Sequence, residues 1–84
     1  TILIVDDEKA NIDSLSMLLE EKYNILTALD GMQALELIKS FPNPEEIHLI
    51  LSDQRMPNLD GVSFLKETIP IIPKTIRMIL TGHT

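Results

Sequence analysis

The stretch that decides the fold is "ILIVDDEKAN", residues 2–11, in which four apolar residues run directly into three acidic ones. A second apolar run, "HLILSDQRMPNLDG" (48–61), also meets an aspartate, Asp53. Short apolar runs with β-branched residues are typical of strands that are buried on both faces of a parallel sheet. The two stretches therefore predict buried strands that end in carboxylates, although like charges repel one another.

Strand and helix patterns alternate along the rest of the sequence. Strands are predicted at residues 2–5, 23–29, 47–52 and 75–80. Strands that alternate with helices of this size predict successive βαβ units and a parallel sheet. Because such crossovers are right-handed, we expect helices to cover both faces of an α/β sheet.

Three amphipathic helices are predicted between these strands. The first spans residues 9–22, the second follows an N-cap at Asp30 with Gln33 close to a capping box, and the third follows Asp60 and Gly61. The prolines of "FPNP" (41–44), Pro70 and Pro73 end the second and third helices. The apolar residues expected to face the core, by their helical spacing, are Ile12, Leu15, Leu19, Ala34, Leu37, Ile38, Val62, Leu65 and Ile69.

Length and composition limit the classes of protein to consider. The 84 residues suit one domain or part of one, and the chain starts at Thr1 rather than Met, so we expect a fragment of a longer protein. A formal net charge of −6 argues against direct nucleic acid contact from this segment. No apolar run approaches the roughly 20 residues that cross a membrane. The absence of cysteine suits a reducing, cytoplasmic location.

Polar residues follow three of the predicted strands. Asp6 and Asp7 follow the first strand, Asp53 the third, and Thr81 the fourth. In open α/β sheets ligands bind outside the carboxyl ends of the strands, so these residues are expected to converge. Crowded carboxylates without His or Cys suit Mg²⁺, which takes one or two carboxylates and keeps several waters. An aspartate in such a place can also act as a nucleophile and form an aspartyl-phosphate.

Each of these residues also has a simpler interpretation. Asp6 or Asp7 alone fits an N-cap of the following helix, and Asp60 fits a cap or turn residue before Gly61. Asp53 alone fits a polar turn, and Thr81 fits a turn at a strand end. The combination of paired Asp, single Asp and Thr at successive strand ends favours the functional interpretation.

The segments "ILIVDDE", "LILSDQRMPNLDG" and "ILTGHT" together resemble the three signature segments of the response-regulator receiver domain, the CheY-like phosphoacceptor of two-component signalling. The resemblance covers the whole chain, in order and in spacing. It implies a flavodoxin-like, doubly wound parallel sheet. The strand order expected for this chain is 2-1-3-4. Residues 1–84 are expected to form one receiver domain that is incomplete at its C-terminus.

The resemblance also implies a role for each site residue. Asp53 would be the phosphoacceptor, and Thr81 would be the switch hydroxyl that moves toward the phosphoryl group. Asp6, Asp7 and Asp53, with the backbone carbonyl of Arg55, would hold Mg²⁺. The domain would assist its own phosphorylation without being an enzyme.

The implied partners are a sensor histidine kinase or phosphotransfer protein and a C-terminal effector domain of the same polypeptide. No membrane contact is implied. Arg55 and His83 lie two residues after Asp53 and Thr81, so their side chains are expected either to tune hydrolysis of the phosphoryl group or to be exposed loop residues.

The sequence departs from the family pattern after the fourth strand. A full receiver continues through a fourth helix, a fifth strand that carries the family's lysine, and a fifth helix. Lys74 does not replace that lysine, because it precedes the fourth strand. Without these elements the fourth strand is expected to be an exposed apolar edge, which favours a dimer or a strand-swapped pairing with another chain.

Two other functions fit parts of the sequence. A receiver-like docking module would bind a partner without being phosphorylated, and it would have no need of Mg²⁺. A Mg²⁺-dependent phosphohydrolase with an Asp nucleophile would carry a D-x-D pattern after the first strand, and the "VDDE" of residues 5–8 lacks that spacing.

Overall fold

The structure is a computed structural model that describes residues 1–80 of the 84-residue chain. Strands and helices alternate along the described part, joined by short loops and one 3₁₀ turn. In chain order the elements are β1 (Ile2–Val5), α1 (Lys9–Leu19), β2 (Ile25–Ala28), α2 (Gly31–Ser40), η1 (Pro44–Glu46), β3 (Leu49–Asp53), α3 (Gly61–Thr68) and β4 (Ile76–Leu80).

The strands form one parallel sheet in the order β2-β1-β3-β4, which confirms the predicted order. At the carboxyl end of the sheet Val5 of β1 lies opposite Ala28 of β2 and Ser52 of β3, and Asp53 lies opposite Leu80 of β4. Asp6 and Asp53 therefore come one residue after this shared register, at the same edge of the sheet.

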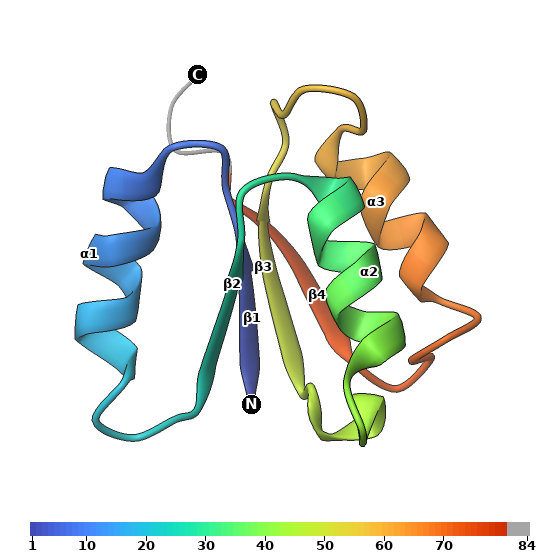
Figure 1. Ribbon diagram of the computed structural model, residues 1–84, viewed down its shortest axis with the longest axis horizontal. Helices are drawn as coiled ribbons and strands as arrows, with labels where there is room; N and C mark the ends of the chain where they lie inside the picture. Colours follow the sequence, from blue (N-terminus) through green and yellow to red (C-terminus); the bar gives the residue numbers. More distant parts are fainter. Residues whose placement is uncertain (81–84) are drawn as a thin grey trace.

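The sheet is covered by α1 on one face and by α2 and α3 on the other (Figure 1). Alternate residues of β1 serve the two faces, because successive side chains of a strand point in opposite directions. Leu3 and Val5 belong to the larger core under α2 and α3, whereas Ile2 and Ile4 pack with Ile12 of α1. This double burial explains why the first strand is apolar at every position.

The N-cap predicted at Asp30 is confirmed, and Asp60, for which a cap and a turn were both left open, is the N-cap of α3. The Gln33 backbone amide donates to Asp30 Oδ1 at 2.8 Å, and the Gln33 side chain accepts from the Leu29 amide at 3.0 Å. The Ser63 amide donates to Asp60 Oδ1 at 2.8 Å. These side chains satisfy backbone donors that have no partner within the first helical turn.

Two details of the helices differ from the sequence prediction. α1 ends at Leu19 rather than at residue 22, because the Lys22 and Tyr23 amides turn back to the Leu19 carbonyl and redirect the chain toward β2. An unpredicted 3₁₀ turn, η1, follows α2 and leads into β3.

The buried face of α3 was predicted wrongly in part. Val62 and Ile69 are 45% and 51% exposed, while Leu65 is buried as expected. Phe64, which lies next to Leu65 in the sequence, is fully buried and packs in the core under α2 and α3. A large aromatic side chain buries more apolar area than Val62 would, so packing on α2 selects the face that contains Phe64.

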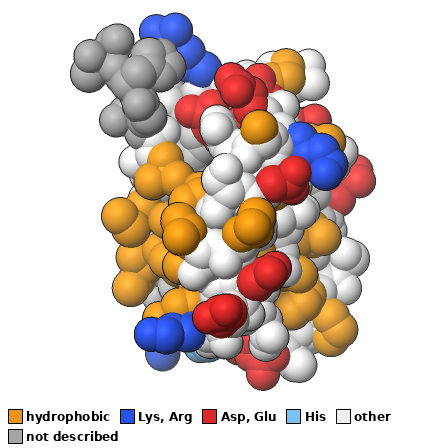
Figure 2. Space-filling model, turned by 90° about the vertical axis from the view of Figure 1, so that its left-hand side faces the viewer, with side chains coloured by type: hydrophobic (Ala, Val, Ile, Leu, Met, Phe, Trp, Pro, Cys, Tyr) orange, Lys and Arg blue, Asp and Glu red, His pale blue; other side chains and the backbone are white. Residues whose placement is uncertain are grey.

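β4 forms one edge of the sheet within residues 1–80, since it pairs there with β3 alone. Ile76 and Met78 are 64% and 48% exposed on this strand. Figure 2 shows hydrophobic side chains gathered along one side of the molecule in that view. The exposed apolar edge agrees with the sequence prediction. Pairing with another chain stays a prediction.

No helix among residues 1–80 is long and apolar enough to span a membrane.

Candidate functional site

Three carboxylates meet where β1 and β3 end. Asp6 and Asp7 follow β1 directly, and Asp53 is the last residue of β3. One carboxylate oxygen from each of the three side chains lies within 4.8 Å of the other two. Asp6 is buried, Asp53 is partly buried and Asp7 is exposed, so the cluster opens from the sheet edge to solvent.

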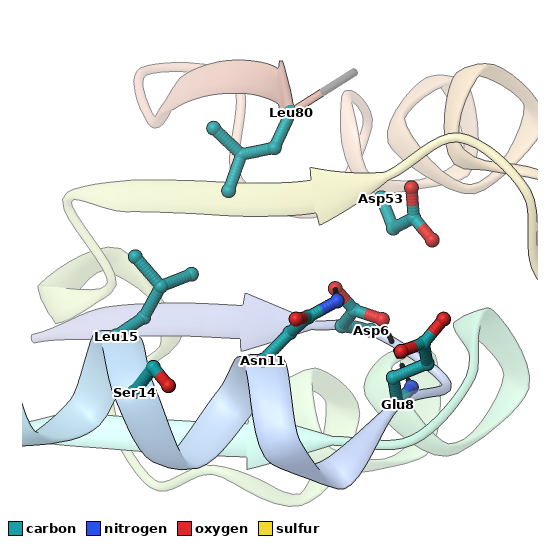
Figure 3. A pocket seen from close by; sticks show the side chains of 7 residues that line it. All are labelled: Asp6, Glu8, Asn11, Ser14, Leu15, Asp53 and Leu80. Carbon is teal, nitrogen blue, oxygen red and sulfur yellow. Dashed lines mark hydrogen bonds between the residues drawn. The ribbon is translucent and has the colours of Figure 1, made fainter. Parts of the chain in front are cut away.

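Asp6 is held by two donors from the start of α1. The Glu8 backbone amide donates to Asp6 Oδ1 at 2.9 Å, and Asn11 Nδ2 donates to Asp6 Oδ2 at 3.1 Å (Figure 3). The N-cap position of α1 is Glu8, whose side chain makes no capping bond. Asp6 therefore lies beside the positive end of the helix dipole, which favours its negative charge, and its side chain points toward the cluster.

The loop after β3 folds back against Asp53. The Gln54 backbone amide donates to Asp53 Oδ1 at 2.9 Å. The Gln54 carbonyl accepts from the Gly61 amide at 3.0 Å, and Gln54 Oε1 accepts from the Val62 amide at 2.9 Å. Gln54, the residue after the predicted phosphoacceptor, thus links the end of β3 to the first turn of α3.

Gly61 is required by this close approach. A Cβ at position 61 would overlap the Asp53 carbonyl oxygen and would lie 3.0 Å from Gln54 Cα. Backbone atoms cannot swing aside as the end of a side chain can. Because only glycine leaves this space open, "DG" at residues 60–61 combines a helix cap with a contact that shapes the site.

Asp60 lies near this cluster in sequence but has a different task. Its hydrogen bond from the Ser63 backbone amide holds the pKa of the Asp60 carboxyl below its usual value. It is not one of the three carboxylates that lie within reach of a common ion.

The acidic cluster opens into a cleft of about 260 Å³. Asp53 and Asp6 face one another across one end of it, and Leu15 and Leu80 form the other end (Figure 3). The lining residues are Asp6, Glu8, Asn11, Ser14, Leu15, Asp53 and Leu80.

The donor set of this cleft fits a hard divalent cation. Carboxylate oxygens are the ligands that Mg²⁺ prefers, and the lining contains neither Lys nor Arg among the described residues. Three carboxylates within 4.8 Å repel one another unless a cation lies between them. Mg²⁺ keeps several waters, so an open and partly exposed cluster suits it better than a closed cage.

The other predicted site residues stand differently. Arg55 is exposed in the loop two residues after Asp53, and the role of its carbonyl as a metal ligand stays a prediction. Thr81 and His83 lie outside the described residues. Lys74 lies before β4, at the opposite edge of the sheet from Asp53.

Sequence reasoning missed two contacts that shape the site. Asn11, which bonds Asp6, and Gln54, which bonds the start of α3, were not singled out. A polar residue within the first turn after the acidic pair was a usable signal for Asn11. No local pattern marks Gln54, because its partner is eight residues away.

Comparison with known proteins assigns the chain to a family. The model of the response regulator receiver domain matches residues 2–84. The hydrogenase transcriptional regulatory protein HoxA of Cupriavidus necator is 39% identical over 84 residues, which are 100% of this chain and 17% of that protein. The transcriptional regulatory protein GlrR of Escherichia coli K12 is 32% identical over 83 residues, 98% of this chain and 18% of that protein.

Solved structures agree with this assignment. A CheY-like receiver domain protein from Methanospirillum hungatei has a TM-score of 0.87 at 30% identity, over 99% of this chain and 64% of that one. The receiver domain of the hybrid histidine kinase CckA has a TM-score of 0.85 at 34% identity, over 93% of this chain and 71% of that one.

The chain belongs to the response regulator receiver domain family of two-component signalling. It spans about a sixth of the length of the curated relatives HoxA and GlrR.

Proposed function

We propose that this chain is a phosphoacceptor switch of a two-component phosphorelay and that Asp53 receives the phosphoryl group. The observation that carries the proposal is the meeting of Asp6, Asp7 and Asp53 within 4.8 Å at the carboxyl edge of the sheet. Family membership supports it, because it places the same chain in two-component signalling.

Asp53 has one oxygen available for attack. Its Oδ1 accepts the Gln54 amide, whereas Oδ2 accepts no hydrogen bond from the described residues. In the proposed step Oδ2 attacks the phosphorus of a phosphohistidine on the partner kinase or phosphotransfer protein. The O–P bond forms as the P–N bond breaks, and the electron pair goes to the imidazole nitrogen, which is then protonated by water. The product is an aspartyl-phosphate.

Charge is the main obstacle to this step, because an anionic phosphoryl group must approach three carboxylates. Asp6, Asp7 and Asp53, with the Arg55 carbonyl, would hold Mg²⁺, which supplies neutralisation of that charge. The protein's own contribution is positioning: the carboxyl ends of β1 and β3 fix the backbone of the carboxylates, and the Glu8 and Asn11 donors orient the Asp6 side chain.

The switch would be read out by other parts of the protein. Thr81, which follows β4 in the sequence, is the proposed switch hydroxyl that hydrogen-bonds the phosphoryl group. Such a contact would shift an equilibrium between two conformations. The relatives HoxA and GlrR are transcriptional regulatory proteins, so we propose a C-terminal effector domain with a regulatory output and no catalysis in the receiver itself.

The test is phosphorylation of the full-length protein by a small acyl phosphate with Mg²⁺, followed by intact-mass spectrometry. We expect wild type to gain one phosphoryl group and Asp53→Asn to gain none. Asp60→Asn is the matched control, because it removes a neighbouring carboxylate but keeps an N-cap acceptor, and it should be phosphorylated like wild type. Equal phosphorylation of wild type and Asp53→Asn would disprove the assignment.

The same protein distinguishes the docking alternative. A phosphorylation-independent docking module has no need of a cation, so a Mg²⁺ titration followed by calorimetry should then show no binding. We expect saturable binding in wild type.

A further inference from the structure

We propose that Asn11 is the positioning residue of the metal site: its amide holds the Asp6 carboxylate in the orientation that binds Mg²⁺. This inference rests on the proposed function and deepens it. Asn11 itself need not touch the ion, because it would act through Asp6.

The hydrogen bonds around Asp6 carry the argument. Asp6 Oδ1 accepts the Glu8 amide at 2.9 Å, and Oδ2 accepts Asn11 Nδ2 at 3.1 Å. A carboxylate offers about four lone-pair positions, so each oxygen keeps one for an ion or its waters. With a donor on each oxygen, rotation of the carboxyl group is restricted, and a ligand already oriented loses less entropy when the cation binds.

Helix capping does not explain this contact. The start of a helix has backbone N–H groups without partners, so it needs acceptors. Asn11 uses its side chain as a donor, toward a carboxylate that lies five residues earlier. Its own backbone amide is already satisfied by the Glu8 carbonyl at 3.0 Å. The donated bond therefore serves Asp6 and not the helix.

The position of Asn11 in the cleft supports the same role. It lies between Asp6 and Ser14 along the wall that α1 contributes, and all three residues line the cleft (Figure 3). The exposed helix surface leaves room for substitution at position 11, because Asn11 is not part of either hydrophobic core.

The experiment measures the Mg²⁺ dissociation constant of the full-length protein by calorimetry. Loss of an outer hydrogen bond to a metal ligand lowers metal affinity by about 10- to 100-fold. For Asn11→Ala we expect about tenfold, the low end of that range, because the Glu8 amide still holds Oδ1. Asn11→Gln keeps an amide donor on a longer side chain and should restore affinity to within about threefold of wild type.

Two further readouts separate positioning from a general loss of structure. With an acyl phosphate as donor, the Mg²⁺ concentration for half-maximal rate should rise about tenfold in Asn11→Ala. The maximal rate at saturating Mg²⁺ should stay that of wild type, and so should the melting temperature without Mg²⁺. Ser14→Ala is the matched control, since Ser14 lines the same cleft one turn later without bonding Asp6 among the described residues.

The outcomes are distinct. If wild type binds Mg²⁺ and Asn11→Ala binds it equally well, this inference is overturned while the proposed function stands. If wild type binds no Mg²⁺, both are overturned. A fall in the maximal rate and the melting temperature of Asn11→Ala, with an unchanged Mg²⁺ midpoint, shows a structural role and also overturns the inference.

Discussion

Charged side chains have opposite surroundings at the amino and the carboxyl ends of the parallel strands. At the amino edge of β4, the Arg77 guanidinium donates to Thr68 Oγ1 at 2.8 Å, to the Thr75 carbonyl at 2.6 Å and to the Ile72 carbonyl. Partial burial lowers the pKa of Arg77, yet its donors are matched to acceptors around the end of α3. At the carboxyl edge, three carboxylates share one small region.

The difference separates stability from function. The hydrogen bonds of Arg77 hold the α3–β4 loop in place, and the negative end of the α3 dipole also favours a cation there. The acidic cluster has mutual repulsion that no Lys or Arg among its described lining residues relieves. Proteins retain such like-charge repulsion at functional sites, and its cost in stability is compensated by interactions elsewhere in the fold. A substitution in the acidic cluster should therefore weaken metal binding and raise stability, whereas a substitution of Arg77 should lower stability and leave metal binding unchanged.

The largest effect is expected from Asp7→Asn at the carboxyl edge. Loss of one charged ligand should weaken Mg²⁺ binding by about 100-fold, because ligand charge sets the affinity of such sites. The free energy of unfolding without Mg²⁺ should rise, by less than about 1 kcal/mol, since like-charge repulsion is relieved. Calorimetry and urea unfolding measure the two quantities.

Asp13→Asn is the control for that substitution. Asp13 is an exposed acid of α1 that pairs with Lys9 at 3.5 Å, away from the cluster. It should leave Mg²⁺ affinity unchanged. Equal losses of affinity in the two variants would mean that overall negative charge, rather than the cluster, attracts the cation.

The next effect is expected from Arg77→Ala at the amino edge. Removal of the guanidinium takes one donor from two backbone carbonyls and from a buried threonine hydroxyl. Of these acceptors, the Ile72 carbonyl keeps the Thr75 amide at 3.3 Å. We expect a loss of about 2 kcal/mol in the free energy of unfolding, with Mg²⁺ affinity unchanged.

Arg77→Lys sharpens this prediction. Lysine keeps the charge but lacks the planar fork that reaches several acceptors at once. Its stability in urea should fall between those of Arg77→Ala and wild type. A variant as stable as wild type would show that charge alone, and not the fork, stabilises the loop.

The smallest effect concerns Asp60, a structural carboxylate at the functional edge. The Ser63 backbone amide stabilises its charged form, so its pKa is lower in the folded chain than the ordinary value of 3.8. Its stabilisation is fully present above that value and disappears as pH falls through the lower, folded value. In thermal melts, the stability of wild type should therefore fall more steeply below pH 4 than the stability of Asp60→Asn, which has no group to titrate at position 60. An identical loss of stability at low pH in the two proteins would contradict this role of the Asp60 carboxylate.

Much of the fold could be predicted because its signals are local. Asp30 and Asp60 cap their helices as expected, since a cap depends on residues within one turn. The strand order was implied by the resemblance to receiver domains, and the meeting of Asp6 with Asp53 followed from the rule that ligands bind at the carboxyl ends of parallel strands. The face of α3 did not follow, because Val62 and Phe64 are both apolar and only packing on α2 distinguishes them.

By itself the sequence determined which residues are available at the site and where the chain turns, since apolar runs, caps and prolines act over a few residues. Only the tertiary structure decided how the side chains are held: the Asn11 amide on Asp6, the Gln54 link to α3 and the fork of Arg77. These contacts depend on the distance and direction between elements. Packing of the whole core sets both, so even the local signal for Asn11, a polar residue soon after the acidic pair, does not specify its contact.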